Sequence, residues 1–132
     1  MANILIFEDN AEFAAELSDA CERAGQTSHE TSSLSTLRKI VDDTYFEIAL
    51  VDLMVPESGN LGANGVKAIS AIRSAEKKHE KQTTVVIVSG SAAFMREGSG
   101  EKLLTVLRAD GLISKPVSAM VVIDEVTREY LD

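Results

Sequence analysis

The sequence predicts an α/β fold in which helices cover both faces of a doubly wound, five-stranded parallel sheet. Two observations lead to this prediction. Short apolar runs recur along the chain, and each is followed by a segment whose apolar residues repeat at helical spacing. Strand and helix segments that alternate in this way build parallel sheets with helices on the outside.

The first half of the chain contains three of the predicted strands. The run NILIF, residues 3–7, precedes a helix predicted over residues 10–24, which Gly25 ends. The polar segment QTSHET, residues 26–31, is a weaker strand candidate, and SLSTLRKIV predicts a short helix after it. The third strand is YFEIALVD, residues 45–52. Its following loop, residues 53–65, contains one proline and three glycines.

The second half supplies the remaining strands. A helix that carries Val66, Ile69 and Ile72 leads to the fourth strand, TTVVIVSG, residues 83–90. Residues 91–111 contain a Gly-Ser-Gly loop and a further helix. The fifth strand is the short run GLIS, residues 111–114. The last helix follows Pro116, and its predicted inward residues are Val122, Val126 and Tyr130.

Strand composition predicts the order of the sheet. The runs ILIF, IALV and VVIV are apolar throughout, as expected of central parallel strands that are covered on both faces. The second strand is polar and the fifth is short, which suits the two edges. Strands one, three and four in the middle give the flavodoxin-like order 2-1-3-4-5.

Length and composition limit the classes of protein. A chain of 132 residues predicts one domain, residues 1–132. A net charge of −8 argues against a nucleic acid as direct partner, because phosphate binding needs a basic face. No apolar run has the length of a membrane span or of a signal peptide. The single cysteine, Cys21, suits a reducing compartment and a place in the core, so we expect a cytoplasmic protein.

Polar side chains stand where the predicted strands end. Glu8 and Asp9 follow the first strand, and Asp52 follows the third. Ser89 ends the fourth strand and the fifth runs into Lys115. Ligands of such folds bind outside the carboxyl ends of the strands, so we expect these side chains to converge on one site.

The chemistry of this set indicates a metal and a phosphoryl group. Three clustered carboxylates repel one another unless a cation lies among them, and an all-oxygen site with few protein ligands suits Mg²⁺. A metal alone does not require Ser89 or Lys115, whereas the peripheral oxygens of a phosphoryl group can contact both. Asp52 lies centrally in the set and is the candidate nucleophile.

Four short motifs resemble those of the receiver domains of bacterial two-component response regulators. They are FEDN, VDLMVP, VIVSG and LISKP, one at each of four strand ends, and the resemblance covers essentially the whole chain. Each motif alone is weak, but all four in this order are specific. The resemblance implies a phospho-accepting signalling switch. Its catalysis is self-directed: phosphotransfer to its own aspartate and autodephosphorylation.

The resemblance also implies a role for each site residue. Asp52 accepts phosphate from a phosphohistidine. Asp9 binds Mg²⁺ directly and Glu8 mostly through water, with Asp52 and the backbone carbonyl of Met54 as further ligands. The implied partners are a histidine kinase or phosphotransfer protein and a downstream effector protein, and a homodimer remains open.

Around the phosphoryl group, the resemblance places Ser89 and Lys115 in direct contact and leaves space beside it at Gly90. It also implies a cis bond between Lys115 and Pro116, a form whose low cost is confined to bonds before proline. The loop after Pro56 is about five residues longer than is usual in the family, which is cheap in a surface loop. The segment between Ser89 and Lys115 is also long, and Leu112 stands where the family often has an aromatic switch residue. These departures bear on signal output.

Other functions predict other residues. A dinucleotide or flavin module needs glycines or hydroxyls after the first strand, where this chain has acids. A haloacid-dehalogenase-type phosphatase also uses an aspartyl nucleophile and Mg²⁺, but with a D-x-D motif on its first strand, and here Met54 stands two residues after Asp52. A degenerate receiver that serves only as a protein-interaction module is the third alternative.

Each site residue, taken singly, also has an ordinary structural explanation. Asp9 and Asn10 can cap a helix, Ser89 can be an ordinary strand-end hydroxyl and Lys115 can be a surface lysine.

Overall fold

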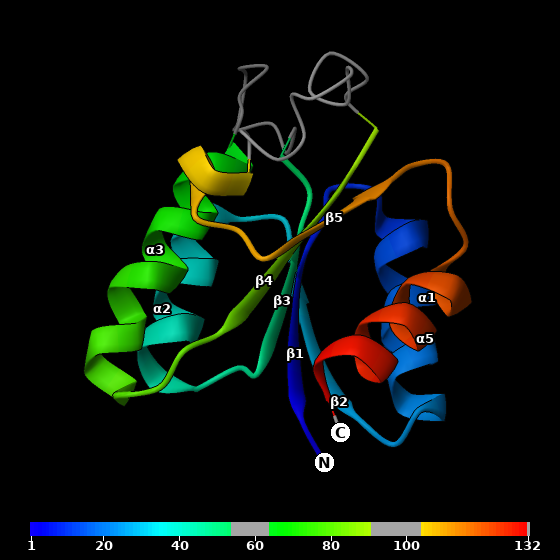
Figure 1. The fold of residues 1–132 in the computed structure, drawn as a ribbon, viewed down its shortest axis with the longest axis horizontal. Coiled ribbons are helices and arrows are strands. Elements are labelled where there is room, and N and C mark those ends of the chain that lie inside the picture. Colours follow the sequence, from blue (N-terminus) through cyan, green and yellow to red (C-terminus); the bar gives the residue numbers. More distant parts are fainter. Residues whose placement is uncertain (54–63, 91–103, 132) are drawn as a thin grey trace.

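A five-stranded, all-parallel sheet forms the centre of the computed structural model, which describes residues 1–53, 64–90 and 104–131 (Figure 1). The strand order is β2-β1-β3-β4-β5, and every neighbouring pair is parallel. The predicted fold and strand order are therefore confirmed. The strand bounds are β1 Asn3–Phe7, β2 Thr27–Thr31, β3 Ile48–Val51, β4 Thr84–Ser89 and β5 Gly111–Ser114.

Helices cover both faces of the sheet. Helices α1 and α5 lie on one face, and α2 and α3 lie on the other (Figure 1). A helical turn at residues 104–107 precedes β5. None of the helices in these described ranges is long and apolar enough to cross a membrane. The helix bounds are α1 Ala11–Arg23, α2 Leu34–Asp43, α3 Asn64–His79 and α5 Ala119–Tyr130.

Side-chain caps set where three of these helices begin. The side chains of Asn10, Ser33 and Ser118 each accept a hydrogen bond from the backbone N–H three residues later. Such a cap satisfies one of the donors that the first helical turn leaves unpaired. Asn10 therefore precedes α1 rather than belonging to it. The observed helix, Ala11–Arg23, is one residue shorter at each end than the predicted one.

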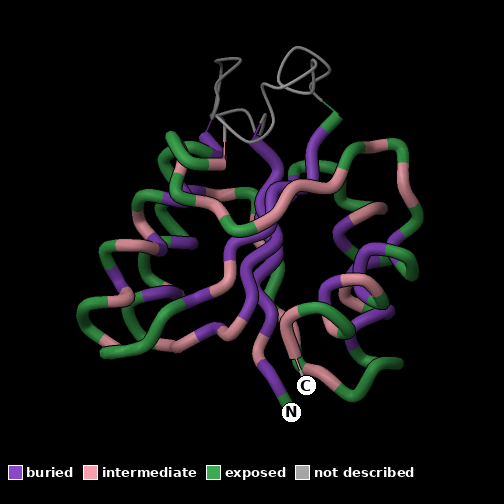
Figure 2. The backbone as a smooth tube through the Cα atoms, in the orientation of Figure 1, coloured by how far each residue is buried: buried purple, intermediate pink, exposed green. Residues whose placement is uncertain are grey.

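Burial explains the order of the strands. All residues of β3, and all but the first of β1 and β4, are buried, whereas β2 and β5 have no buried residue (Figure 2). Two apolar layers result, one between the sheet and α2 and α3, the other between the sheet and α1 and α5. The apolar runs thus occupy the middle of the sheet, where both faces are covered.

Individual side chains follow the predicted helix faces with one exception. Cys21, Val122 and Val126 are fully buried, and Tyr130 packs against the same layer. Burial raises the pKa of the Cys21 thiol to about 11, which agrees with a core residue. Val66, in contrast, is 41 % exposed because it lies on the outer side of α3.

The chain changes direction next to β1. From β1 it leads outward through α1 to β2, at one edge, and then crosses back so that β3 lies on the other side of β1. The carboxyl ends of β1 and β3 therefore lie side by side at a reversal of strand order, which is where ligands bind in open α/β sheets. The loop that begins after Leu53 and most of the segment between β4 and β5 lie outside the described residues.

Candidate functional site

Three carboxylates meet beyond the ends of β1 and β3. Phe7 pairs with Val51 in the sheet, so the residues that follow these two strands are neighbours. One carboxylate oxygen from each of Glu8, Asp9 and Asp52 lies within 4.8 Å of the other two. Glu8 and Asp52 are buried, with exposed fractions of 5 % and 7 %, while Asp9 is exposed. The cluster is thus open to solvent on the Asp9 side.

Two further side chains contact this cluster: Ser89, at the end of β4, and Lys115, directly after β5. The Ser89 hydroxyl lies 3.3 Å from Oδ1 of Asp52 and donates a hydrogen bond to it. The Lys115 ammonium donates to Oδ2 of Asp52 at 3.1 Å and to Oε1 of Glu8 at 2.7 Å. The five residues predicted from the strand ends are therefore all brought together, around the Asp52 carboxylate.

Burial dominates the electrostatics of Glu8. It raises the pKa of the Glu8 carboxyl from 4.5 to about 7, against the opposing effect of the hydrogen bonds from Lys115 and from the backbone N–H of Asn10. For Lys115, burial acts to lower the pKa, but the hydrogen bonds to Glu8 and Asp52 outweigh it and the pKa is raised. Lys115 is therefore firmly cationic at neutral pH, and the Glu8 carboxyl is not fully ionised there.

The arrangement fits a divalent cation. Lys115 brings one positive charge to a cluster of three carboxylates, and the raised pKa of Glu8 shows that this charge does not compensate for the burial of the acid. All three candidate ligands are carboxylate oxygens, the donor type that Mg²⁺ prefers. Met54, whose backbone carbonyl was expected as a further ligand, lies outside the described residues.

Two neighbours of the site were not assigned to it from the sequence. The ring of Phe13, on α1, has its centroid 5.0 Å from the Lys115 ammonium, within the range of a cation–π contact. Gly65, in the first turn of α3, donates its backbone N–H to the carbonyl of Leu53 at 3.1 Å. The helical period places Phe13 on the inner face of α1, but no local pattern shows which group it meets.

Gly65 is required by a close approach of two backbones. A Cβ atom there would lie 2.9 Å from the carbonyl carbon of Asp52, and closer still to the carbonyl oxygen of Asp52 and to Cα of Leu53. The first turn of α3 therefore lies directly against the backbone of Asp52, and a residue without a side chain is needed there. Gly90 differs, since a Cβ atom there would meet Lys115 Cβ at 3.4 Å. The bond between Lys115 and Pro116 is cis.

Comparison with known proteins gives the family. The family model of the response regulator receiver domain matches residues 4–127. The chain belongs to this family. Receiver domains as a class exchange signals with histidine kinases and effector proteins, and they bind Mg²⁺ at an acidic pocket. In this chain Glu8, Asp9 and Asp52 form an acidic cluster that could hold a metal ion.

Solved structures share the fold at low sequence identity. The receiver domain from Methylobacillus flagellatus is 18% identical with a TM-score of 0.76, and 98% of each chain is covered. The receiver domain protein from Methanospirillum hungatei is 17% identical with a TM-score of 0.75, and 98% of this chain and 94% of that one are covered. A response regulator from Burkholderia pseudomallei, solved with a phosphorylated aspartic acid, a calcium ion and citrate, is 19% identical with a TM-score of 0.72; 98% of this chain and 72% of that one are covered. No curated protein sequence matches this receiver domain.

Proposed function

We propose that this receiver domain is a phospho-accepting switch of a two-component system in which Asp52 accepts the phosphoryl group. The observation that carries the proposal is the surroundings of the Asp52 carboxylate. It is buried between the Ser89 hydroxyl, the Lys115 ammonium and two further carboxylates, Glu8 and Asp9. A hydroxyl and an ammonium on one acid, beside an acidic cluster, suit phosphoryl transfer better than they suit a buried structural ion pair.

In the proposed reaction, a carboxylate oxygen of Asp52 forms a bond to the phosphorus of a phosphohistidine on a histidine kinase or phosphotransfer protein. The bond between phosphorus and the imidazole nitrogen breaks, and its electron pair remains on the imidazole. The product is an acyl phosphate on Asp52. Water then attacks the phosphorus, the bond between phosphorus and the Asp52 oxygen breaks, and inorganic phosphate leaves. This step returns the free carboxylate and ends the signal, so the catalysis is confined to the protein's own phosphorylation and dephosphorylation.

Lys115 and Ser89 stabilise the charge on the transferred group. In the absence of phosphate their donors are directed at the two oxygens of Asp52, at 3.1 and 3.3 Å. When one of those oxygens becomes bonded to phosphorus, the same donors can turn to the phosphoryl oxygens. This exchange moves Ser89, at the end of β4, and is the first step by which phosphorylation reaches the surface that partners contact.

Glu8, Asp9 and Asp52 would hold Mg²⁺. When bound, Mg²⁺ supplies positive charge that neutralises the phosphoryl oxygens during transfer. Asp9 is the exposed member of the set, at the solvent side, and Glu8 is the buried one whose pKa is raised to about 7. We therefore assign the direct contact to Asp9 and a contact that is partly through water to Glu8.

Phosphorylation by a small donor tests the acceptor. With acetyl phosphate and Mg²⁺, intact-protein mass spectrometry should show one added phosphoryl group on the wild type and none on Asp52→Asn. The matched control is Asp19→Asn, an exposed acid on α1, which should be phosphorylated like the wild type. Phosphorylation that persists in Asp52→Asn would refute the assignment of the acceptor.

The metal role has its own test. Asp9→Asn should nearly abolish both Mg²⁺ binding, followed by titration calorimetry or chemical shifts, and phosphorylation by acetyl phosphate. Glu8→Gln should reduce both less. Phosphorylation that proceeds at the same rate in excess EDTA would show that the acidic cluster does not act through a metal.

A further inference from the structure

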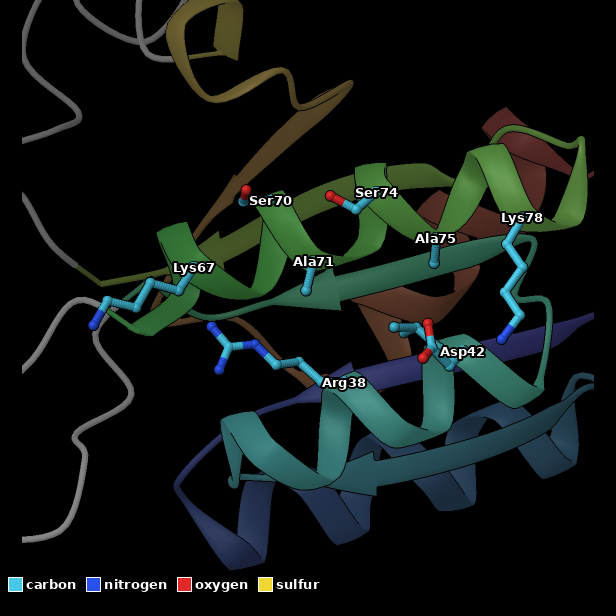
Figure 3. Close-up of a pocket in the computed structure, with 9 residues that line it drawn as sticks. Arg38, Asp42, Lys67, Ser70, Ala71, Ser74, Ala75 and Lys78 are labelled. Atoms are coloured by element: carbon cyan, nitrogen blue, oxygen red, sulfur yellow. The ribbon is translucent and has the colours of Figure 1, made fainter.

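A groove of about 540 Å³ runs between α2 and α3, on the face of the sheet opposite α1 and α5 (Figure 3). Its floor consists of small side chains of α3, among them Ala71 and Ala75, and its walls carry charged ones. Arg38 extends from α2 toward the first turn of α3, and Lys78 extends from α3 toward α2 (Figure 3). The residues that line the groove do not include Glu8, Asp9, Asp52, Ser89 or Lys115, and nothing in the proposed phosphorylation uses it.

The charge of the groove is opposite to that of the protein. Arg38, Lys67 and Lys78 line it together with one acid, Asp42. In the part of the chain that the structure describes, none of these three cations forms an ion pair. Arg38 and Lys67 lie at the same end of the groove, where their like charges repel (Figure 3). The groove thus carries an excess of positive charge on a chain whose net charge is −8.

The imbalance extends over whole layers of the molecule. Helices α1 and α5 carry seven acidic and two basic side chains. Helices α2 and α3, in contrast, carry three acidic and six basic side chains. An anionic partner is therefore repelled by one helical layer and attracted by the other, which guides it to the α2–α3 side.

The dimensions of the groove suit a helix. Eleven positions separate Lys67 from Lys78 on α3, which is about 16 Å along the helix axis. The same length of a second helix spans the groove from one cationic end to the other. Alanine side chains on the floor let such a helix approach closely, as small residues do where helices pack.

We propose that the groove between α2 and α3 docks an acidic helix of a partner protein. One carboxylate of that helix pairs with Arg38 and Lys67, and a second, about three turns away, pairs with Lys78. Small apolar side chains between the two carboxylates pack on Ala71 and Ala75. This docking is independent of the phosphorylation of Asp52, so the two proposals can fail separately.

The probe is a synthetic alanine-based helix with two glutamates eleven positions apart. It is titrated into the ¹⁵N-labelled full chain without Mg²⁺ or a phosphoryl donor, and amide chemical shifts are followed at low and at moderate salt. The expected result is a set of shifts confined to α2 and α3 that weakens as salt increases. Two comparison peptides, one with lysines in place of the glutamates and one with the glutamates five positions apart, should bind at least several-fold more weakly.

Neighbouring lysines provide matched controls for the protein. Arg38→Glu and Lys78→Glu should each weaken binding by roughly three- to tenfold, since each reverses one surface charge pair. Lys39→Glu and Lys77→Glu make the same change of charge one position along the same helices, outside the groove. These two should change binding by less than about twofold, which is the size of a weak, screened interaction.

Several outcomes would overturn the proposal. Equal weakening by the control variants, or shifts on α1 and α5, would mean that the peptide responds to overall charge and not to the groove. The same shifts with inorganic phosphate at equal concentration would indicate a simple anion site at Arg38 and Lys67. Broadening of α2 and α3 signals that grows with protein concentration, without peptide, would assign the groove to a second copy of this chain.

Discussion

Replacing Gly65 with alanine tests whether the first turn of α3 sets the position of Asp52. Two effects on stability oppose each other here. Alanine is a better helix former than glycine, by about 1 kcal/mol in a helix interior. The added Cβ, however, would lie 2.9 Å from the carbonyl carbon of Asp52 and closer to two other backbone atoms. Carbon atoms in contact prefer about 3.5–4.0 Å, so the two backbones must separate by about 1 Å.

The separation determines the expected magnitude. Overpacking in a well-packed region lowers the free energy of unfolding by about 1–3 kcal/mol. The atoms on both sides of this contact belong to the backbone and cannot move aside as a flexible side chain can, so we expect the upper end of this range. After the gain in helix propensity, the free energy of unfolding should fall by about 2 kcal/mol. Asp52 should also move relative to Ser89 and Lys115, so phosphorylation by acetyl phosphate should be slower than in the wild type.

Urea denaturation followed by circular dichroism measures the first effect, and intact-protein mass spectrometry over time measures the second. Ser70→Ala, at an exposed position of the same helix, is the control and should change stability by less than about 0.5 kcal/mol. An alanine at position 65 that stabilises the protein, as propensity alone predicts, would refute the close approach. Normal phosphorylation in a destabilised variant would show that this contact does not position Asp52.

Three further predictions concern single side chains, each checked by urea denaturation. In EDTA, the stability of the wild type relative to Glu8→Gln should fall by up to about 3 kcal/mol as the pH rises from 4.5 to above 7. The reason is that the folded state keeps a proton on Glu8 up to about pH 7, whereas the unfolded state loses it near pH 4.5. The stabilisation by protonated Glu8 is therefore full below pH 4.5 and is lost as the pH rises through 7. A difference in stability between the wild type and Glu8→Gln that does not change with pH would contradict this prediction. Arg73→Lys should lower the free energy of unfolding by about 2 kcal/mol, because the guanidinium donates to two backbone carbonyls and two carboxylates at once. The control is Arg128→Lys, at an exposed position, which should not change the free energy of unfolding measurably. Ser118→Ala should cost about 1 kcal/mol through loss of the α5 cap, and an unchanged midpoint would show that the cap contributes nothing.

The sequence by itself determined the fold and the membership of the acidic cluster. Burial on both faces requires continuous apolar runs, so the central strands β1, β3 and β4 were readable without any structure. The carboxyl ends of parallel strands meet at one edge of the sheet. Residues that directly follow the strands, such as Asp52 and Lys115, therefore come together whatever the details of packing.

Only the tertiary structure decided the contacts that depend on how helices sit on the sheet. Phe13 and Lys115 are about a hundred positions apart, and their contact follows from the rotation and depth of α1. The contact of Gly65 with Asp52 likewise requires the exact placement of the first turn of α3. The cationic groove exists because Arg38 and Lys67, on different helices, are brought to the same end of one interhelical surface. Periodicity fixes which face of a helix is apolar, but it does not fix how two helices pack against each other.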